Sequence, residues 1–155
     1  MLLLFIDIEK DNSNLEIERE VLPMDVLVAD NDISALSNIV ELIKRWGHHA
    51  EKSETAEGTL DKVRKKPFDL VLLDMSLPDM TAQDLIGKLK ELWPDIGIVT
   101  MTSTSTNELE KGIRTLGIVY YMSKPVSENI LKDILDHIST KKKNTLSADS
   151  GLNSF

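Results

Sequence analysis

The chain has 155 residues, which is enough for one domain with a hydrophobic core and too few for two ordinary domains. Its 18 Lys and Arg against 26 Asp and Glu give a formal net charge of −8, so we expect no direct nucleic-acid partner and no binding to an anionic membrane surface. The absence of cysteine excludes disulfides, thiolate metal sites and cysteine nucleophiles, and it suits a reducing cytoplasm.

The N-terminal residues 1–23 predict a flexible arm. Residues 1–6 are apolar, but no positive charge precedes them and Asp7 follows at once, so this run predicts neither a signal peptide nor a membrane span. A cytoplasmic location is therefore expected. Residues 7–20 are mainly acidic and polar, with scattered Ile and Leu that would anchor a helix only weakly.

From residue 24 to residue 140 the chain alternates short apolar runs with segments of helical period. Strands buried on both faces are predicted at 26–29, 70–73, 96–101 and 119–122, with a weaker strand at 48–52. Apolar positions three and four residues apart predict helices over 33–43, 56–63, 85–92, 109–116 and 130–138. Five successive βα units predict an α/β fold, a parallel doubly wound sheet with helices on both faces.

Local signals refine this picture. Ser105, with Glu108 three residues later, predicts a capping box, and Ser127 is placed to cap the last helix. His48 and His49 are predicted to be surface residues with ordinary titration. After the last helix, residues 141–155 have the composition of a flexible tail or linker.

Polar residues stand where four of the strands end. They are Asp30-Asn31-Asp32, Asp74, Thr102-Ser103 and Ser123-Lys124. In a doubly wound sheet these ends lie at the functional edge. Converging carboxylates repel unless a divalent cation lies among them, and an oxygen-rich pocket suits Mg²⁺. A lysine and a hydroxyl there would contact a phosphoryl group, so the set indicates phosphoryl transfer with an aspartate as nucleophile.

These segments closely resemble a known family. VLVADND (26–32), FDLVLLDMSLPDM (68–80), VTMTS (99–103) and YYMSKP (120–125), in this order and spacing, resemble the receiver domain of two-component response regulators. The resemblance covers about residues 24–140 and implies a flavodoxin-like fold for that domain. It also implies a signalling phosphoprotein rather than an enzyme, since such a domain catalyses at most its own phosphorylation and dephosphorylation.

The resemblance implies a role for each matching residue. Asp74 is the phosphoacceptor. The implied Mg²⁺ ligands are Asp30, Asn31, Asp74 and the backbone carbonyl of Ser76, with Asp32 as a further candidate. Lys124 and Thr102 would contact the phosphoryl group, Thr102 and Tyr121 would form the switch, and Lys124-Pro125 would be a cis peptide.

The implied partners follow from the same resemblance. A histidine kinase or a phosphotransfer protein would donate the phosphoryl group to Asp74 as an aspartyl phosphate. The output would be a downstream protein target or a homodimer, bound through the face formed by the helix at 109–116, the strand at 119–122 and the helix at 130–138.

Three departures from the family pattern keep alternatives open. Asn31 stands where a second acid is usual, Ala82 replaces a glycine, and GIVYY (117–121) is unusually apolar. A degenerate receiver that docks proteins without phosphorylation is one alternative. A remote one is a haloacid-dehalogenase-like phosphatase, which would use Asp30 and Asp32 and leave Asp74 without a role. Asn31 as a turn residue and Tyr121 as a core aromatic also remain open.

Overall fold

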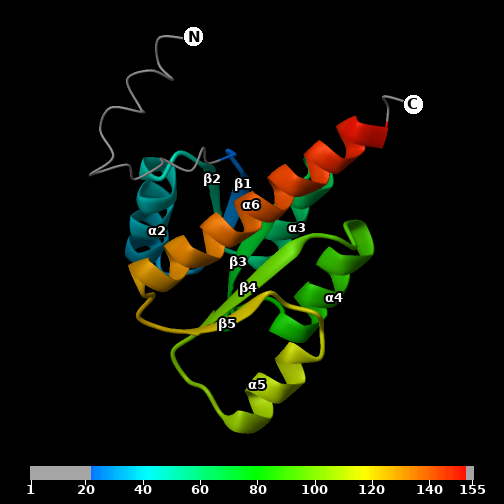
Figure 1. Cartoon of the computed structure of the whole chain (residues 1–155). Helices are drawn as coiled ribbons and strands as arrows, with labels where there is room; N and C mark the ends of the chain where they lie inside the picture. The colour runs from blue at the N-terminus through cyan, green and yellow to red at the C-terminus, as the bar shows by residue number, and fades with distance from the viewer. Residues whose placement is uncertain (1–21, 153–155) are drawn as a thin grey trace.

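The computed structural model describes residues 22–152, which form one parallel five-stranded sheet (Figure 1). The strands are β1 (Asp25–Ala29), β2 (His49–Ser53), β3 (Leu70–Asp74), β4 (Gly97–Thr102) and β5 (Tyr120–Ser123). Their order across the sheet is β2-β1-β3-β4-β5. The strand order reverses between β1 and β3, which brings the carboxyl ends of β1 and β3 side by side. The predicted α/β class is confirmed.

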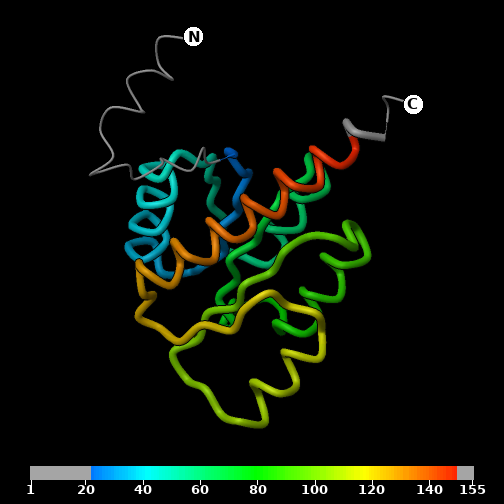
Figure 2. The backbone as a smooth tube through the Cα atoms, viewed as in Figure 1, coloured from blue at the N-terminus to red at the C-terminus, as the bar shows by residue number. Residues whose placement is uncertain are grey.

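Five helices cover the two faces of this sheet, as the backbone trace in Figure 2 shows. They are α2 (Ile33–Arg45), α3 (Ala56–Lys65), α4 (Ala82–Leu92), α5 (Asn107–Arg114) and α6 (Glu128–Leu152). Buried side chains of α2 and α6 form one apolar cluster with the sheet, and those of α3, α4 and α5 form the other. In the described chain no helix is both long and apolar enough to cross a membrane.

The strands are apolar without alternation because helices cover both of their faces. In β1, Leu27 packs into the cluster of α3, α4 and α5, whereas Val28 packs into the cluster of α2 and α6. All five residues of β3 are buried. Burial of this apolar surface is the main stabilising contribution, at about 25 cal/mol per Å², and it fixes the strand ends rigidly.

Helix α5 begins one residue later than the predicted capping box requires. Its N-cap is Thr106, which has an extended backbone and accepts a hydrogen bond from Leu109 N at 3.1 Å. The prediction that Ser105 caps this helix is therefore wrong by one position. Thr106 is the last extended residue before the helix, and Ser105 precedes it. Ser127 Oγ does accept a bond from Ile130 N at the start of α6, at 3.4 Å.

Helix α6 continues to Leu152, whereas the sequence predicts a flexible tail from residue 141. No Gly or Pro interrupts residues 141–150, so no residue there breaks the helix. Lys142 anchors the extension, because its Nζ lies 3.0 Å from Asp69 Oδ2 and 3.4 Å from the carbonyl oxygen of Pro23. Residues 153–155 lie outside the described residues.

The predicted N-terminal arm falls almost entirely outside the described residues, which begin at Leu22. Its last residues, Leu22 and Pro23, contact α6. The Leu22 carbonyl oxygen accepts a hydrogen bond from Ser139 Oγ at 2.8 Å. The start of the described chain is thus held against the final helix.

His48 is buried, with 4% of its surface exposed, which corrects the expectation of an ordinary surface histidine. Its Nδ1 accepts a hydrogen bond from Met24 N at 3.1 Å, so the neutral ring carries its proton on Nε2. Burial lowers the pKa of His48, and the nearby carboxylate of Asp136 on α6 does not offset this. The neighbouring His49 is exposed, as expected for the next residue along an extended chain.

This geometry predicts a loss of stability at mildly acidic pH. The pKa of His48 in the folded protein lies below its unfolded value of 6.5. The contribution of the neutral ring to the free energy of unfolding is therefore fully present above pH 6.5, and it declines as the pH falls toward the folded pKa. The slope should approach about 1.4 kcal/mol per pH unit. His48→Asn keeps an acceptor for Met24 N without titrating. Urea unfolding should therefore show a flatter pH dependence for this variant, and equal slopes in the two proteins would contradict the assignment.

Candidate functional site

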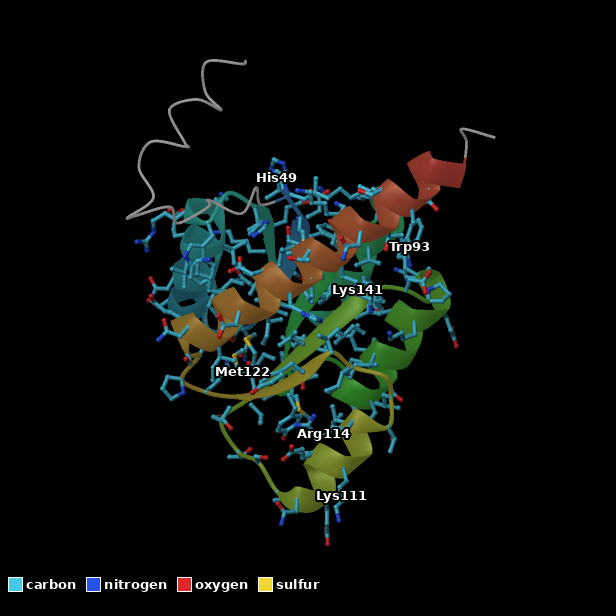
Figure 3. The ribbon with its side chains drawn as sticks, in the orientation of Figure 1. His49, Trp93, Lys111, Arg114, Met122 and Lys141 are labelled. Atoms are coloured by element: carbon cyan, nitrogen blue, oxygen red, sulfur yellow. The ribbon has the colours of Figure 1, made fainter. Side chains whose placement is uncertain are left out.

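Three strand ends converge on one buried ion cluster. Asp30 follows β1, Asp74 ends β3, and Lys124 follows β5. Lys124 Nζ lies 2.8 Å from Asp30 Oδ2 and 3.1 Å from Asp74 Oδ2. The carboxylates are 0% and 3% exposed and the lysine side chain is 21% exposed. In Figure 3, Met122 marks β5 two residues before Lys124. The sequence-predicted acid, nucleophile and lysine therefore lie in direct contact.

The carboxylate of Asp74 is held at both oxygens. Oδ1 accepts hydrogen bonds from Ser76 N and Ser76 Oγ, each at 3.0 Å, while Oδ2 faces Lys124. The chain leaving Asp74 is fixed by the bond from Met75 N to the Met101 carbonyl oxygen in β4, at 2.9 Å. This arrangement also places the Ser76 backbone beside Asp74.

The pKa shifts of Asp74 and Lys124 follow from this contact. Burial raises the pKa of the Asp74 carboxyl, but the hydrogen bonds from Ser76 and Lys124 outweigh it and bring the pKa below its ordinary value. Burial lowers the pKa of Lys124, but its bonds to Asp30 and Asp74 outweigh that effect and raise the pKa. At neutral pH the site therefore contains a carboxylate and an ammonium group in contact.

The two residues after Asp30 have different positions. Asp32 N donates to Asp30 Oδ1 at 2.9 Å, and the Asp32 side chain is the N-cap of α2, where it accepts from Ser34 N and Ala35 N. Asp32 therefore caps the helix through Oδ1, whereas Lys124 pairs with Asp30 and Asp74. Asn31 is exposed beside Asp30.

Among the described residues, neither predicted switch residue forms a side-chain hydrogen bond with the ion cluster. Thr102 Oγ1 donates to the Thr104 carbonyl oxygen at 2.8 Å and accepts from Thr104 N at 3.2 Å. Tyr121 is 7% exposed, and its hydroxyl has no hydrogen-bond partner in the described part of the chain. Lys124 is linked to β4 by its backbone, since Lys124 N donates to the Thr102 carbonyl oxygen at 2.7 Å, and the Lys124-Pro125 peptide bond is cis.

The oxygen donors at the site fit a hard divalent cation. Asp30 and Asp74 offer two buried carboxylates, and the Ser76 carbonyl and the Asn31 amide lie next to them in sequence. Mg²⁺ binds proteins through one or two carboxylates and keeps several waters, so it needs no larger protein cage. Within residues 22–152, no group of three or more His, Asp and Glu side chains is placed to hold a metal ion.

One contact near the site escaped the sequence analysis. Asp79, in the loop after Asp74, accepts hydrogen bonds from Ala56 N at 2.8 Å and Glu57 N at 3.0 Å, at the start of α3. These bonds lower the pKa of Asp79. An acid after Pro78 is a weak sequence signal, because its partners are 22 and 23 residues away along the chain.

Residues 26–136 match the family described as the response regulator receiver domain. The chain belongs to this family. Transcriptional regulatory protein ZraR of Salmonella typhimurium is 31% identical over 113 residues, which are 73% of this chain and 26% of that protein. Two-component response regulator ARR2 of Arabidopsis thaliana is 32% identical over 122 residues, which are 77% of this chain and 18% of that protein. The receiver chain thus spans about a quarter or less of the length of these relatives.

Solved receiver structures share the fold. A CheY-like receiver domain protein from Methanospirillum hungatei is similar with a TM-score of 0.73 and 26% identity, over 79% of this chain and 99% of that one. Chemotaxis protein CheY4 of Vibrio cholerae gives a TM-score of 0.70 at 20% identity, over 76% and 99%, which supports the fold alone. The predicted flavodoxin-like architecture is confirmed.

Removal of the positive charge of Lys124 should destabilise the receiver at neutral pH. Lys124→Met leaves two buried carboxylates without their shared partner, so we expect a loss of about 3 kcal/mol at pH 7 in urea unfolding. The pKa of Asp74 should rise, which can be followed by carboxyl-carbon NMR, and the variant should regain stability as the pH falls. Lys132→Met is the matched control, because Lys132 makes only an exposed pair with Asp136 worth about 0.5 kcal/mol. Equal losses would contradict the central role of Lys124.

Proposed function

We propose that this receiver accepts a phosphoryl group on Asp74 from a histidine kinase or phosphotransfer protein in a Mg²⁺-dependent reaction, and that the aspartyl phosphate then switches a protein-docking surface. The contact of the Lys124 ammonium group with the carboxylates of both Asp30 and Asp74 is the observation that carries the proposal. A cytoplasmic location, compatible with the absence of cysteine, is part of it.

The proposed reaction uses the lowered pKa of Asp74. Its carboxylate oxygen attacks the phosphorus of a phosphohistidine, the new O–P bond forms as the P–N bond breaks, and the imidazole leaves. Lys124 is positioned to neutralise charge on the phosphoryl oxygens, because its ammonium group already faces Asp74. Bound Mg²⁺ would supply further charge neutralisation, with Asp30, Asn31, Asp74 and the Ser76 carbonyl as its proposed ligands.

Two open depressions border the ion cluster and the loop that follows Asp74. One open depression of about 530 Å³ is bordered by Asp30, Ser103 and Lys124. Another, of about 570 Å³, is bordered by Ser76 and Thr102 among others. Asp74 itself lines neither depression, but its partners Lys124 and Ser76 each border one of them.

The proposed switch depends on the present partners of Thr102 and Tyr121. A phosphoryl oxygen would compete with Thr104 for the Thr102 hydroxyl, and the buried Tyr121 hydroxyl has a partner to gain if it moves. The phosphoryl group must contact one arrangement better than the other for this shift to occur.

The proposed docking surface is formed by α5, β5 and α6. Figure 3 labels Lys111 and Arg114 on α5 and Met122 on β5. At the start of β5, Val119 and Tyr120 are 46% and 37% exposed, which gives this face exposed apolar side chains suited to a protein partner or a second copy of the chain, whereas Met122 is buried.

A degenerate receiver is the second candidate, and Asn31 is the observation that favours it. An amide oxygen can ligate a cation but adds no charge, so the pocket holds two acids where a third is usual. In this reading the fold and docking surface remain, and binding to a partner does not depend on Asp74.

Labelling with acetyl phosphate separates these two functions. We expect one phosphoryl group per chain on Asp74 in the presence of Mg²⁺, detected by intact mass spectrometry and peptide mapping. Asp74→Asn should abolish it, and Asp84→Asn, an exposed acid in the first turn of α4, should not. Persistent labelling of Asp74→Asn would reject Asp74 as the acceptor, and absence of labelling in the unaltered protein would favour the degenerate receiver.

Restoring an acid at position 31 should strengthen Mg²⁺ binding. Asn31→Asp places a third carboxylate beside Asp30, and the added charge should lower the dissociation constant by about tenfold in isothermal titration calorimetry. Asn38→Asp, on α2 but outside the proposed ligand set, is the control for net charge. An equal gain in both variants would show that Asn31 does not contact the cation.

A further inference from the structure

We propose that Asp79 is a positioning residue for the phosphorylation site, acting through the turn between β2 and α3. This inference rests on the proposed function of Asp74. Asp79 itself is exposed and, in the described part of the chain, forms no hydrogen bond or ion pair with Asp74 or Lys124, so it would act through the backbone that carries Ser76.

Asp79 ties the loop after β3 to the first residues of α3. Its two carboxylate oxygens accept from Ala56 N and Glu57 N, which are among the unsatisfied donors of that helix end. The N-cap of the same helix is Thr55, whose side chain accepts from Gly58 N at 3.0 Å. Two side chains therefore satisfy this helix end, and one of them belongs to the phosphorylation loop.

The same turn also holds the other acidic strand end. Asp30 N donates to the Ser53 carbonyl oxygen at 3.0 Å, and Ser53 Oγ donates to the Thr55 carbonyl oxygen at 3.0 Å. Ser53 is 6% exposed, so water does not readily replace these bonds. Hydrogen bonds and the short stretch of backbone between them thus connect Asp30 to the turn and the turn to Asp79.

A side chain larger than that of glycine does not fit at position 58, next to this turn. A Cβ atom on Gly58 would lie 2.8 Å from Ser53 Oγ and 2.9 Å from Thr55 Oγ1, which is closer than real Cβ contacts allow. Glycine at position 58 therefore leaves room for the Ser53 and Thr55 hydroxyls in their present hydrogen bonds.

The loop between Asp74 and α4 is fixed at three places. Met75 N is bonded to β4, and Thr81 caps α4 by accepting from Asp84 N at 3.2 Å. Asp79 supplies the third attachment, midway between them. Its loss would release the middle of the loop and let the Ser76 backbone, a proposed cation ligand and a hydrogen-bond donor to Asp74, leave its position.

Two variants separate positioning from mere stabilisation of α3. Asp79→Ala removes a cap of α3 together with the attachment of the loop, whereas Thr55→Ala removes a cap of the same helix end and leaves the loop attached. Asp79→Asn keeps one acceptor oxygen and provides a milder change if Asp79→Ala fails to fold. Thermal unfolding of all three establishes that the compared proteins are folded.

We expect Asp79→Ala to lower the initial rate of acetyl phosphate labelling of Asp74 by about tenfold, with Asp79→Asn in between and Thr55→Ala close to the unaltered protein. The amide resonance of Ser76 should move in the Asp79 variants and not in Thr55→Ala. Equal rates and an unmoved Ser76 resonance in Asp79→Ala would overturn the proposal.

Labelling of Asp74 and the amide resonance of Ser76 test the proposed phosphorylation and the positioning role of Asp79 separately. If the unaltered protein is not labelled on Asp74, the proposed function fails, and the Ser76 resonance still decides whether Asp79 positions the loop. If the unaltered protein is labelled and the Asp79 and Thr55 variants slow labelling equally, Asp79 acts only by stabilising α3, and the positioning role is rejected.

Discussion

Two carboxylates can be buried at the end of this sheet because one ammonium group lies between them. Asp30 and Asp74 are almost completely shielded from water, and without Lys124 their mutual repulsion and desolvation would oppose folding. The three residues come from the ends of three different strands, so the interaction exists only when the sheet is complete. The same contact leaves Asp74 charged and its second oxygen engaged by Ser76, which is the state that a nucleophile needs.

The surrounding elements are arranged to hold these strand ends. The all-buried strand β3 lies at the centre of the sheet, and helices on both faces prevent it from shifting. Beyond its end, the chain is fixed in turn by β4, by α3 through Asp79 and by α4 through Thr81. The site therefore combines a rigid base with a loop whose attachments are individual hydrogen bonds, and such loops can respond to a local change of charge.

At the amino ends of the strands, charged residues hold α6 against the sheet. Asp69 accepts a hydrogen bond from Asp25 N and pairs with Lys142, so α6 is fastened at the amino ends of the strands as well as along its apolar face. His48 is buried nearby as a neutral ring. This end of the molecule lies opposite the proposed phosphorylation site and contributes stability and the placement of α6.

Several features were determined by the sequence alone. Continuous apolar runs required strands that are covered on both faces, and the segments of helical period provided the helices that cover them. Asp30, Asp74 and Lys124 stand at strand ends, and these ends lie at one edge of a parallel sheet, so the three residues were expected to meet. Asp32 caps α2 from the position directly before the apolar helical period, which is where an N-cap residue is expected.

Only the tertiary structure decided the rest. Three features depend on partners that are distant in the sequence: the burial of His48, the helical continuation past Thr140 and the attachment of Asp79 to α3. Their hydrogen-bond partners lie 24, 119 and 23 residues away, and local sequence patterns do not reveal such partners. From the sequence, the hydroxyl of Thr102 could have faced Asp74 or its own loop, and in the structure it is bonded to Thr104. Local sequence fixes which groups arrive at the edge of the sheet, while long-range packing fixes which of them touch.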